Sequence, residues 1–528
     1  MKQCPQCRRA YSDDALRFCR KDGTPLVGVN TEDLPTAALR GLSSAGLPIS
    51  RPFSSSPLSA SLKKPRASRR PIDSLAVLPF TNVGANVEME YFSDGITESI
   101  INALSKLPKL RVVARSVIQR YRRREVDPLR VGQELDVRAV LAGRVLQNGQ
   151  ALMIGTELID VANGAQLWGE RFNRKLADVF AVQEEIAKRI TERLRLKLAV
   201  KQGKELVKRY TENAEAYQAY LKGRYYWEKR SQGAMQTAIH YFQQAIEIDP
   251  SYAVAYSGLA DCFNTIGWFR VAPAKDVFPK AKTAATKAIE IDDTLAEGHT
   301  SLAYANFLYD WDWKKADRGF RRALRLNPKY ATAHQWYAVY LWAMGRLDEA
   351  VTHARQAQEL DPLSLVHNLT LGMALYFARR FGESEEQFKK TLEIEPRFYP
   401  AKLSLSLAYQ ELGQVEKAIA EIEAARVIED LPVVESYLGG AYALAGRYED
   451  ARRIIDELQE RSKTNYVSPF EIAVIYADLN EKEKAIEWFQ KALDERASWM
   501  VFLKTAPKFD RLMTEPGYVE LLRRLKLT

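Results

Sequence analysis

The chain has 528 residues, of which 46% are hydrophobic and 27% charged. This composition is typical of globular protein and the length allows several domains. Four cysteines, three of them within the first 19 residues, exclude a secreted disulfide scaffold. No stretch approaches the roughly 18 consecutive apolar residues of a membrane helix, and the amino terminus lacks the apolar core of a signal peptide. We therefore expect a cytoplasmic protein without a membrane segment.

Three cysteines near the amino terminus predict a metal site. Cys4 and Cys7 are separated by two residues, and Cys19 and Asp22 follow where a second knuckle would end. Zinc requires this geometry, because four ligands must converge tetrahedrally from two turns. The segment resembles the short zinc ribbons at the amino termini of bacterial signalling proteins, which read Cys-x-x-Cys, then Phe-Cys, then Asp-Gly-x-x-Leu.

Residues 1–27 are accordingly expected to form a zinc-ribbon-like unit with one structural zinc, held by Cys4, Cys7, Cys19 and, as the weaker fourth ligand, Asp22. A water could replace Asp22, because the first histidine is His240. The alternative is a metal-free ribbon. We favour the metal, since so short a unit has little core of its own and structural zinc supplies on the order of 10 kcal/mol.

Residues 28–72 are rich in serine and proline and end in a basic run. Such a segment cannot bury enough apolar surface to offset its ordering entropy, so a disordered linker is expected. Its basic end could meet nucleic acid or an acidic protein, but a solvated tail is the simpler interpretation.

Residues 73–200 predict a compact α/β domain, because short apolar runs alternate with helical periodicity. The expected elements are a strand at 74–80, a helix at 90–107, a strand at 110–114, a helix at 129–137, strands at 139–147, 151–161 and 166–174, and a helix at 179–198. Asn148-Gly149 and Asn163-Gly164 predict two hairpins of type I′, in which both central residues have positive φ.

Several motifs of this domain resemble the TolB-like amino-terminal domain across its whole length. They read LAVLPF, EYFSDGITESIINALSKL, LRVVAR, DVRAVLAGRV, LIDVANGAQLWGERF and DVFAVQEEIA. The resemblance implies a non-catalytic α/β domain that recurs in bacterial regulators, between a signalling module and tetratricopeptide repeats. Asp94-Gly95 opens a predicted helix, where an anion could bind; we expect an ordinary helix cap instead.

Residues 205–496 repeat a pattern with a period near 34 residues. A small residue is followed four positions later by a large apolar or small residue, and seven positions later by a small or apolar one. The pattern occurs at Ala238/Phe242/Ala245, Ala281/Ala285/Ala288, Ala316/Phe320/Ala323, Ala350/Ala354/Ala357, Ser384/Phe388/Thr391, Ala418/Ile422/Ala425, Ala451/Ile455/Leu458 and Ala485/Phe489/Ala492. This pattern is identified as that of the tetratricopeptide repeat, in which helical hairpins stack because none can bury its apolar stripe alone.

The expected fold class is thus multidomain: a small zinc ribbon, an α/β TolB-like domain and an all-α tetratricopeptide solenoid of about eight repeats. Gly345, Gly413 and Gly446 are expected in the turns between paired helices, where positive φ is needed. Residues 497–528 lack the pattern and predict a helical cap over the last apolar face, with inward-facing Trp499, Phe502, Phe509 and Leu521.

The repeats predict an interaction scaffold that binds a protein or peptide along a concave groove. By register, the exposed groove positions are expected at Tyr304, Phe307, Trp342, Tyr376, Phe377 and Gln410. Aromatic side chains dominate many interfaces, but packing between helices is the alternative at each of these positions.

No catalytic signature occurs in the sequence, so an enzyme is not expected. A phosphate-binding loop, the protein-kinase motifs and a nucleophile elbow are all missing. His299, His334 and Cys262 fall on first helices of the repeats and are expected to pack there. A second hypothesis is that the chain is a nucleic-acid-linked transcriptional regulator. Residues 109–130 carry eight basic and two acidic side chains and could contact phosphates. The sequence does not indicate the oligomeric state.

The predicted zinc site is tested by elemental analysis of the protein purified under reducing conditions. We expect one zinc per chain. Cys7→Ser should abolish binding, because a thiolate ligand is lost, whereas Asp22→Ala should only weaken it. Absence of bound metal from the unmodified chain would contradict the prediction.

Overall fold

The computed structural model describes residues 2–3, 10–11, 27–28, 72–83, 90–105, 107, 110–122, 126–194 and 210–528. The chain divides into two compact units, Met1–Ala67 and Ser68–Thr528. Within the first unit, the short strands β1 (Lys2–Gln3), β2 (Ala10–Tyr11) and β3 (Val27–Gly28) form an antiparallel sheet in the order β2-β1-β3. The predicted zinc ligands Cys4, Cys7, Cys19 and Asp22 lie outside the described residues.

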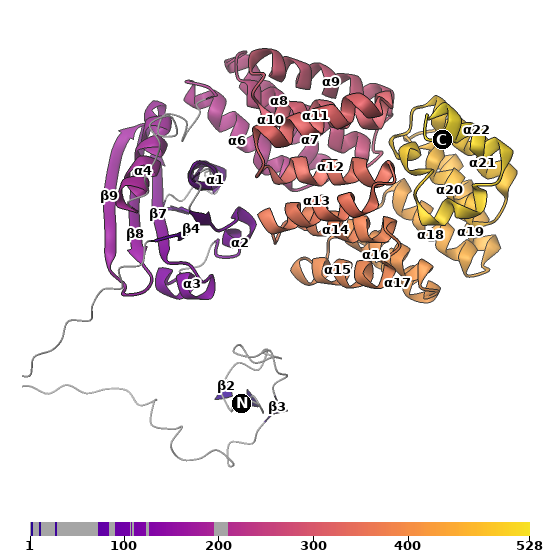
Figure 1. Cartoon of the computed structure of the whole chain (residues 1–528), viewed down its shortest axis with the longest axis horizontal. Helices are drawn as coiled ribbons and strands as arrows, with labels where there is room; N and C mark the ends of the chain where they lie inside the picture. Colours follow the sequence, from indigo (N-terminus) through magenta and orange to yellow (C-terminus); the bar gives the residue numbers. More distant parts are fainter. Residues whose placement is uncertain are drawn as a thin grey trace, which may run out of the picture. The chain divides into compact units, whose positions relative to one another are not determined.

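The second unit begins with a mixed sheet (Figure 1). Its strand order is β6-β4-β7-β8-β9; β4 runs parallel to β6 and β7, and β7, β8 and β9 form an antiparallel meander. A further short strand, β5, pairs in parallel with β7. The strands are β4 (Ser74–Val77), β5 (Thr81–Asn82), β6 (Arg111–Val112), β7 (Ala139–Asn148), β8 (Ala151–Asp160) and β9 (Gln166–Lys175).

Helices cover both faces of this sheet. On one face α1 and α4 share an apolar core with β4, β7 and β8; on the other, α2 and α3 pack against side chains such as Ala76 and Val140. The helices are α1 (Glu90–Ser105), α2 (Arg115–Gln119), α3 (Pro128–Glu134) and α4 (Val179–Arg193), the last preceded by the 3₁₀ turn η4 (Leu176–Asp178). The arrangement is the expected α/β domain.

The two glycine turns of the meander are present, but neither is of the predicted type I′, because Asn148 and Asn163 do not have positive φ. Gly149 and Gly164 have φ of 57° and 69°. Asn148 pairs with Ala151, so the first loop consists of Gly149 and Gln150, and only the glycine has positive φ. Glycine therefore supplies the one left-handed residue that the turn requires.

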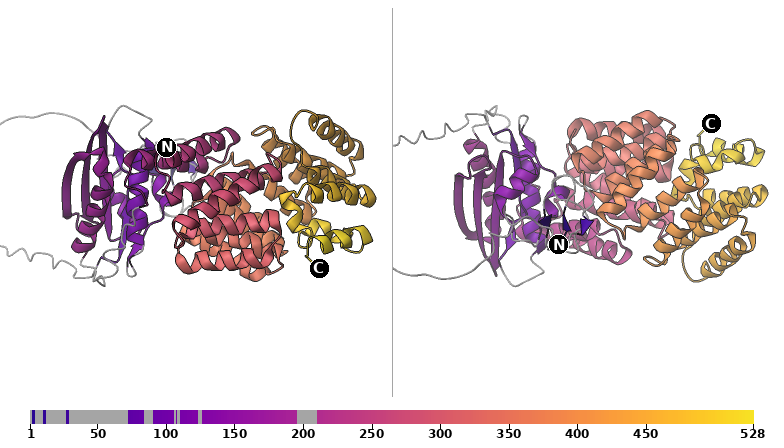
Figure 2. Two further views of the ribbon diagram at one scale, coloured as in Figure 1. Left: turned by 90° about the horizontal axis from the view of Figure 1, so that it is seen from above. Right: turned by 90° about the horizontal axis from the view of Figure 1, so that it is seen from below.

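The rest of the second unit is a stack of eight helical hairpins, followed by shorter turns and a final helix (Figures 1 and 2). In chain order the hairpins are α6/α7 (Ala214–Glu228, Gln232–Ile248), α8/α9 (Ala253–Trp268, Ala274–Ile291), α10/α11 (Ala296–Ala305, Trp313–Leu326), α12/α13 (Ala331–Ala343, Leu347–Leu360), α14/α15 (Leu365–Phe377, Phe381–Ile394), α16/α17 (Tyr399–Glu411, Val415–Arg426), α18/α19 (Pro432–Leu444, Tyr448–Arg461) and α20/α21 (Pro469–Asp478, Lys482–Asp494).

The repeat pattern explains this stacking. The small marker residues are buried, and large apolar markers such as Phe242 lie between hairpins. A Cβ at Gly223 or Gly258 would come within 2.7 Å of the Phe242 ring, so both glycines permit close approach of neighbouring helices. First helices contact one another from hairpin to hairpin and form what we call the inner face of the array. The predicted helical solenoid is confirmed for this part of the chain.

The turns within the hairpins also follow the sequence. Gly345, Gly413 and Gly446 have φ between 71° and 77°, as expected for the residue that ends a first helix. The extra residues of the second repeat lengthen its helices, and α9 has 18 residues. Helix α10 continues into a π-helical turn, η5 (Asn306–Asp310).

The α/β domain packs on the first hairpin. Tyr217 and Leu221 of α6 belong to the apolar core of the α/β domain, and a Cβ at Gly95 of α1 would meet the Leu221 side chain at 2.3 Å. Farther along, the backbone N–H of Leu363 donates to Ser116 Oγ (3.0 Å) and the N–H of Ser116 donates to Asp361 Oδ1 (3.3 Å). The α/β domain therefore contacts the array near its first hairpin and again near the fifth.

The chain ends in η6 (Ser498–Phe502), η7 (Pro507–Leu512) and α22 (Pro516–Arg524); we call residues 497–528 the C-terminal segment. Phe502, Phe509 and Leu521 are buried in it, and Trp499 is half-buried. Among the residues that the structure describes, no helix combines the length and the apolar character needed to cross a bilayer.

Candidate functional site

The six side chains predicted to line an exposed groove lie on the inner face, but five of them are buried. Trp342 retains 1% of its surface, and only Gln410 remains half-exposed. The buried residues are Tyr304, Phe307, Trp342, Tyr376 and Phe377. The register assigned to them is consistent with the structure, because Trp342 stacks on Phe377 of the next hairpin at 5.2 Å. The prediction that they are exposed is wrong.

Phe502 of the C-terminal segment covers these aromatic residues. Its ring centroid lies 6.2 Å from that of Trp342, 5.5 Å from that of Phe377 and 6.3 Å from that of Phe307. A fourth contact, at 5.9 Å, reaches Trp268 at the end of α8. These separations are those of favourable tilted aromatic pairs. One side chain thus bridges the second to the fifth hairpin, and the predicted groove is filled by the chain itself.

Polar contacts fix the C-terminal segment in place. Ser498 Oγ donates to the carbonyl of Gly267 (2.8 Å), and Trp499 Nε1 donates to the carbonyl of Trp268 (3.2 Å). Both carbonyls belong to the last turn of α8, where a helix leaves its carbonyl groups without internal partners. The C-terminal segment therefore adds two hydrogen-bond donors at this helix end.

A buried ion pair joins the second hairpin to the eighth. The guanidinium of Arg270 donates to the carboxylate of Glu471, and both side chains are almost completely buried. The same guanidinium lies 4.2 Å from the centre of the Trp499 ring. At the surface, the guanidinium of Arg379 forms a bidentate ion pair with the carboxylate of Asp510, with N–O distances of 2.7 and 2.8 Å. The second and fifth hairpins are thus held to the last hairpin and to the C-terminal segment.

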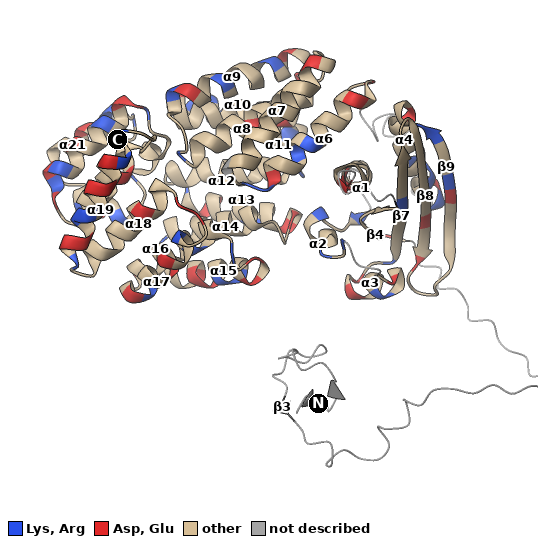
Figure 3. Ribbon diagram, turned by 180° about the vertical axis from the view of Figure 1, so that it is seen from behind, with Lys and Arg blue, Asp and Glu red and all other residues tan. Residues whose placement is uncertain are grey.

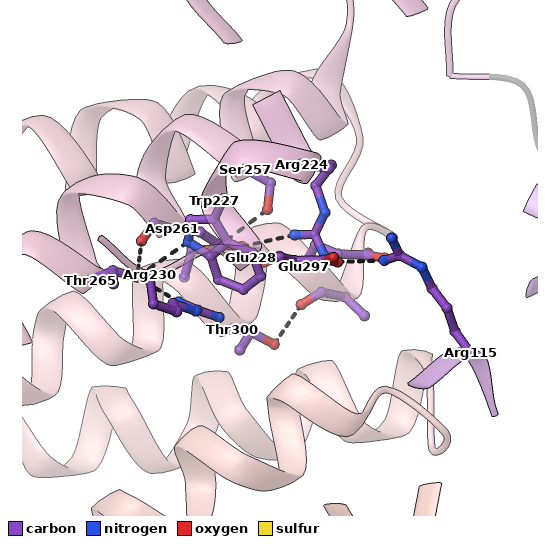
Figure 4. A network of polar contacts seen from close by, with 12 residues as sticks. Arg115, Arg224, Trp227, Glu228, Arg230, Ser257, Asp261, Thr265, Glu297 and Thr300 are labelled. Atoms are coloured by element: carbon purple, nitrogen blue, oxygen red, sulfur yellow. Dashed lines mark hydrogen bonds and ion pairs between the residues drawn. The ribbon is translucent and has the colours of Figure 1, made fainter. Parts of the chain in front are cut away.

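A network of charged side chains, which the sequence analysis did not identify, links the α/β domain to the inner face (Figure 4). Arg115 of α2 pairs with Glu98 of α1 at 3.0 Å and with Glu228 of α6. No sequence signal marks this role, since Arg115 is one of many cations in a basic segment. Its two partners come from different domains, so Arg115 acts as a cross-link between them.

Asp261 lies at the inner end of this network (Figure 4). Its carboxylate accepts a hydrogen bond from Ser301 and lies 4.0 Å from the guanidinium of Arg224. Burial nevertheless raises the pKa of Asp261 to about 7, against the opposing effects of Ser301, Arg224 and Arg230. Arg230 in turn rests over the Trp227 ring at 3.6 Å. The partners of Asp261 therefore all come from the repeats.

Asp94 and Gly95 do not cap a helix, so that prediction is wrong. They lie inside α1, which begins at Glu90. Asp94 pairs with Arg122 at 2.9 Å, and burial raises its pKa to about 6 despite this arginine. Gly95 is the point of close approach to α6. The two residues serve the packing of the α/β domain on the array, so an anion-binding role is not supported.

The described cations of the basic segment 109–130 have partners within the chain. Among its cations that the structure describes, Arg115 and Arg122 pair with acids of α1 or α6 and Arg130 pairs with Glu134. Arg111 donates to the carbonyl of Asp136, and Arg120 donates to the hydroxyl of Tyr121. Along the repeats, acidic and basic residues are intermixed (Figure 3). These observations reduce the support for phosphate binding.

The histidines of the first helices are packing residues, as expected. His299 and His334 each contact a carbonyl six residues earlier, at 2.8 and 2.9 Å, and Asn368 makes the corresponding contact at 2.7 Å. Cys262 is buried. Within the described part of the chain, no group of three or more His, Cys, Asp or Glu side chains could hold a metal.

Known family models match both parts of the second unit. Tetratricopeptide repeats match residues 219–252, 307–364, 369–430, 432–457 and 470–498. The α/β domain matches the family described as HilA/YgeH-like transcriptional regulator, second domain, over residues 71–189. The chain is therefore a tetratricopeptide repeat protein, whereas the TolB-like assignment remains a prediction.

Similar proteins carry different names. The putative adenylate cyclase 3 of Rhizobium meliloti is 35% identical over 237 residues, which are 44% of this chain and span only 40% of that relative. The transcriptional regulator HilA of Salmonella typhimurium is 21% identical over 436 residues, 81% of this chain and 70% of HilA. The type IV pilus assembly protein PilF of Pseudomonas aeruginosa is 26% identical over 178 residues, 30% of this chain and 70% of PilF.

The burial of Trp342 predicts a loss of stability on truncation. Trp342→Ala should lower the free energy of unfolding by about 3–5 kcal/mol, because it removes a large buried ring and leaves a cavity beside Phe502. Tyr448→Ala, at a half-exposed ring of the same array, is the matched control and should change little. Thermal or urea unfolding measures both. Equal melting temperatures for the two variants would show that the inner face is open.

The environment of Asp261 predicts a pH dependence of stability. Its pKa is higher in the folded chain than the ordinary 3.8, so its stabilising contribution is complete below 3.8 and is lost as the pH rises through about 7. Asp261→Asn cannot ionise. Between pH 5 and pH 8 the unfolding free energy of the variant should therefore rise by about 2–3 kcal/mol relative to the unmodified chain.

Asp293→Asn, at an exposed carboxylate in the turn before α10, is the control for this measurement. Its stability should follow that of the unmodified chain across the same pH range. Parallel curves for Asp261→Asn and the unmodified chain would show that the buried carboxyl does not titrate in this interval.

Proposed function

We propose that the chain is a non-catalytic protein–protein interaction scaffold in bacterial signalling or regulation. The observation that carries this proposal is the array of eight hairpins, since tetratricopeptide repeats indicate a scaffold that binds a protein or peptide. A regulatory role is supported by the likeness of the α/β domain to the second domain of a transcriptional regulator family. A cytoplasmic location is part of the proposal.

The partner would bind the outside of the array rather than the buried inner positions. Exposed apolar side chains cluster at the turns within the sixth and seventh hairpins: Leu412 is 37%, Leu444 39% and Tyr448 53% exposed. Leu412 and Leu444 end the first helices of adjacent hairpins, and Tyr448 begins the next helix. We call these three residues the turn patch. Half-exposed Gln410 precedes Leu412 by two residues in the sequence.

The turn patch suits a protein or peptide better than a small molecule. Its side chains protrude rather than line a cavity, and tyrosine is enriched among residues that contribute most to interfaces. Apolar side chains on adjacent turns provide a row of anchors, which an extended segment or a helix could contact at regular spacing.

The non-catalytic part of the proposal rests on the sequence and on the site. Neither the repeats nor the described α/β residues bring together a nucleophile, a base and an oxyanion-binding group. The name of the Rhizobium relative concerns a protein of which this chain spans 40%. We further propose that the TolB-like domain regulates rather than catalyses, and that the amino-terminal ribbon holds a structural zinc through Cys4, Cys7, Cys19 and Asp22.

A second candidate function is a nucleic-acid-linked transcriptional regulator. The likeness to HilA over 81% of the chain favours it, whereas the internal pairing of Arg115 and Arg122 does not. A contribution from phosphate contacts would appear as duplex DNA binding that weakens steeply with salt. Absence of binding at low salt would exclude it.

The turn patch is tested by affinity capture with the full chain, followed by titration of the recovered partner. Tyr448→Asp and Leu444→Asp should weaken binding by about 2 kcal/mol or more, roughly 30-fold, because each places a charge in an apolar contact. Val427→Asp is the matched control: Val427 is 88% exposed but lies at the opposite end of the sixth hairpin. Equal affinity of all three variants would contradict the proposed surface.

A further inference from the structure

Strand β9 forms one edge of the α/β sheet. It has ten residues, Gln166–Lys175, and pairs along its length with β8. Within the described ranges no strand lies on its other side, and Figure 1 shows it as the outermost strand of the sheet. A long edge strand presents unpaired N–H and C=O groups, which favour pairing with another strand. The charge pattern of β9 indicates which strand fits it.

The ladder with β8 fixes which backbone groups point outward. The N–H of Leu176 donates to the carbonyl of Gln150 at 2.8 Å, directly after the pair formed by Lys175 and Ala151. In an antiparallel ladder the N–H and C=O of one residue point to the same side, and the side alternates along the strand. Even-numbered residues from Trp168 to Arg174, which follow the register shift of the ladder, therefore face β8. The backbone groups of Arg171 and Asn173 point outward, and the guanidinium of Arg174 donates to the carbonyl of Asn173 at 3.2 Å.

The side chains of the strand alternate in the same way. Trp168 and Phe172 face α4 and are buried. Glu170 and Arg174 lie on that face too, where Glu170 accepts a hydrogen bond from Trp168 Nε1 at 3.2 Å and approaches Arg189 at 3.8 Å. Arg174 approaches Glu185 of α4 at 4.0 Å. The side chains of Glu170 and Arg174 are 35% and 49% exposed, so both are accessible at the edge. Arg171, on the opposite face, is exposed.

A second copy of β9 fits this edge in one register. A two-fold axis that continues the sheet places residues of the same face opposite each other. With the axis at Phe172, Arg171 faces Asn173 of the second copy, so that their outward N–H and C=O groups pair. Glu170 then lies opposite Arg174 of the second copy, and the symmetry makes this contact twice. Opposite charges on directly facing residues stabilise a strand pair.

Neighbouring registers lack this complementarity. An axis at Arg171 places two arginines opposite each other, and an axis at Glu170 places two glutamates opposite each other; both arrangements are destabilising. An axis at Gly169 leaves Glu170 and Arg171 facing uncharged residues. An axis at Asn173 brings Arg171 against Lys175. The charge pattern of the strand thus selects the axis at Phe172.

We propose that two copies of the chain associate through β9, antiparallel about a two-fold axis at Phe172, and form one continuous sheet. The interface uses the outward backbone of Arg171 and Asn173 and the two Glu170–Arg174 contacts. It is independent of the turn patch, so each surface can be tested without the other. An acidic extended peptide is the competing occupant, because Arg171, Arg174 and Lys175 would also attract it.

Sedimentation velocity of the full chain and two charge variants tests the proposal. Glu170→Arg and Arg174→Glu each place like charges opposite in a homodimer, so each variant alone should be monomeric at concentrations where the unmodified chain is dimeric. Mixed in equal amounts, they should form a heterodimer, because the first variant carries arginine at both positions and the second carries glutamate at both. Each of the two facing pairs then joins opposite charges. An unchanged far-ultraviolet circular dichroism spectrum confirms that each variant is folded.

Two further variants separate backbone pairing from general charge effects. Arg171→Pro removes an outward N–H at an edge position where proline is tolerated in the monomer, and it should abolish the dimer. Glu157→Arg makes the same charge change on the inner strand β8, at an exposed residue away from the edge, and should leave the dimer intact.

The outcomes are distinct. Monomeric variants that recover a dimer on mixing support the proposal. A monomeric unmodified chain at about 100 μM, a dimer that survives Arg171→Pro, or variants that stay monomeric when mixed would each overturn it. Binding of a poly-glutamate peptide by a monomeric chain would assign the edge to an acidic partner instead.

Discussion

In a stack of helical hairpins, each apolar face is buried by the neighbouring hairpin. The two ends of the stack, and aromatic side chains on its inner face, must therefore be buried by other parts of the chain. In this chain Phe502 provides that cover for the inner face. Its ring contacts aromatic residues from four consecutive hairpins, and Ser498 and Trp499 anchor the same segment to the end of α8. The C-terminal segment therefore closes the array as well as covering its last hairpin.

The opposite end of the array is closed by the α/β domain. Leu221 and Tyr217 of the first hairpin belong to the core of that domain, and Arg115 forms ion pairs to both parts. The inner face is consequently unavailable to a partner at the positions usually considered for such repeats. Among the described residues, the turn patch and the edge strand β9 are accessible, and both lie outside the groove.

The sequence predicted the elements that depend on local pattern. Helical period, small marker residues and turn glycines such as Gly345 act within about one repeat, so the hairpins and their turns could be recognised. The register of Trp342 could be assigned for the same reason. Its burial could not, because Ser498 and Gly267, which fix the covering segment, are 231 residues apart in sequence. Contacts at that separation leave no periodic signal.

The charged network was unpredictable for a related reason. Asp261 is the only charged residue of α8, and Arg115 lies in a basic segment. Only the folded chain shows that each has a partner from another element. The basic segment consequently suggested phosphate binding, although its described cations serve internal pairs. The Asp94-Gly95 motif was similarly misassigned, since the reason for glycine is the side chain of Leu221, far away in sequence.

Hydrogen–deuterium exchange of the native chain tests the closure of the array most directly. If the C-terminal segment is part of the inner core, the amides of residues 498–512 exchange as slowly as those of α12 and α14, because they open only when the array unfolds. Exchange of these residues within seconds, while α12 and α14 stay protected, would show that the segment is a detached tail and that the inner face is open to a partner.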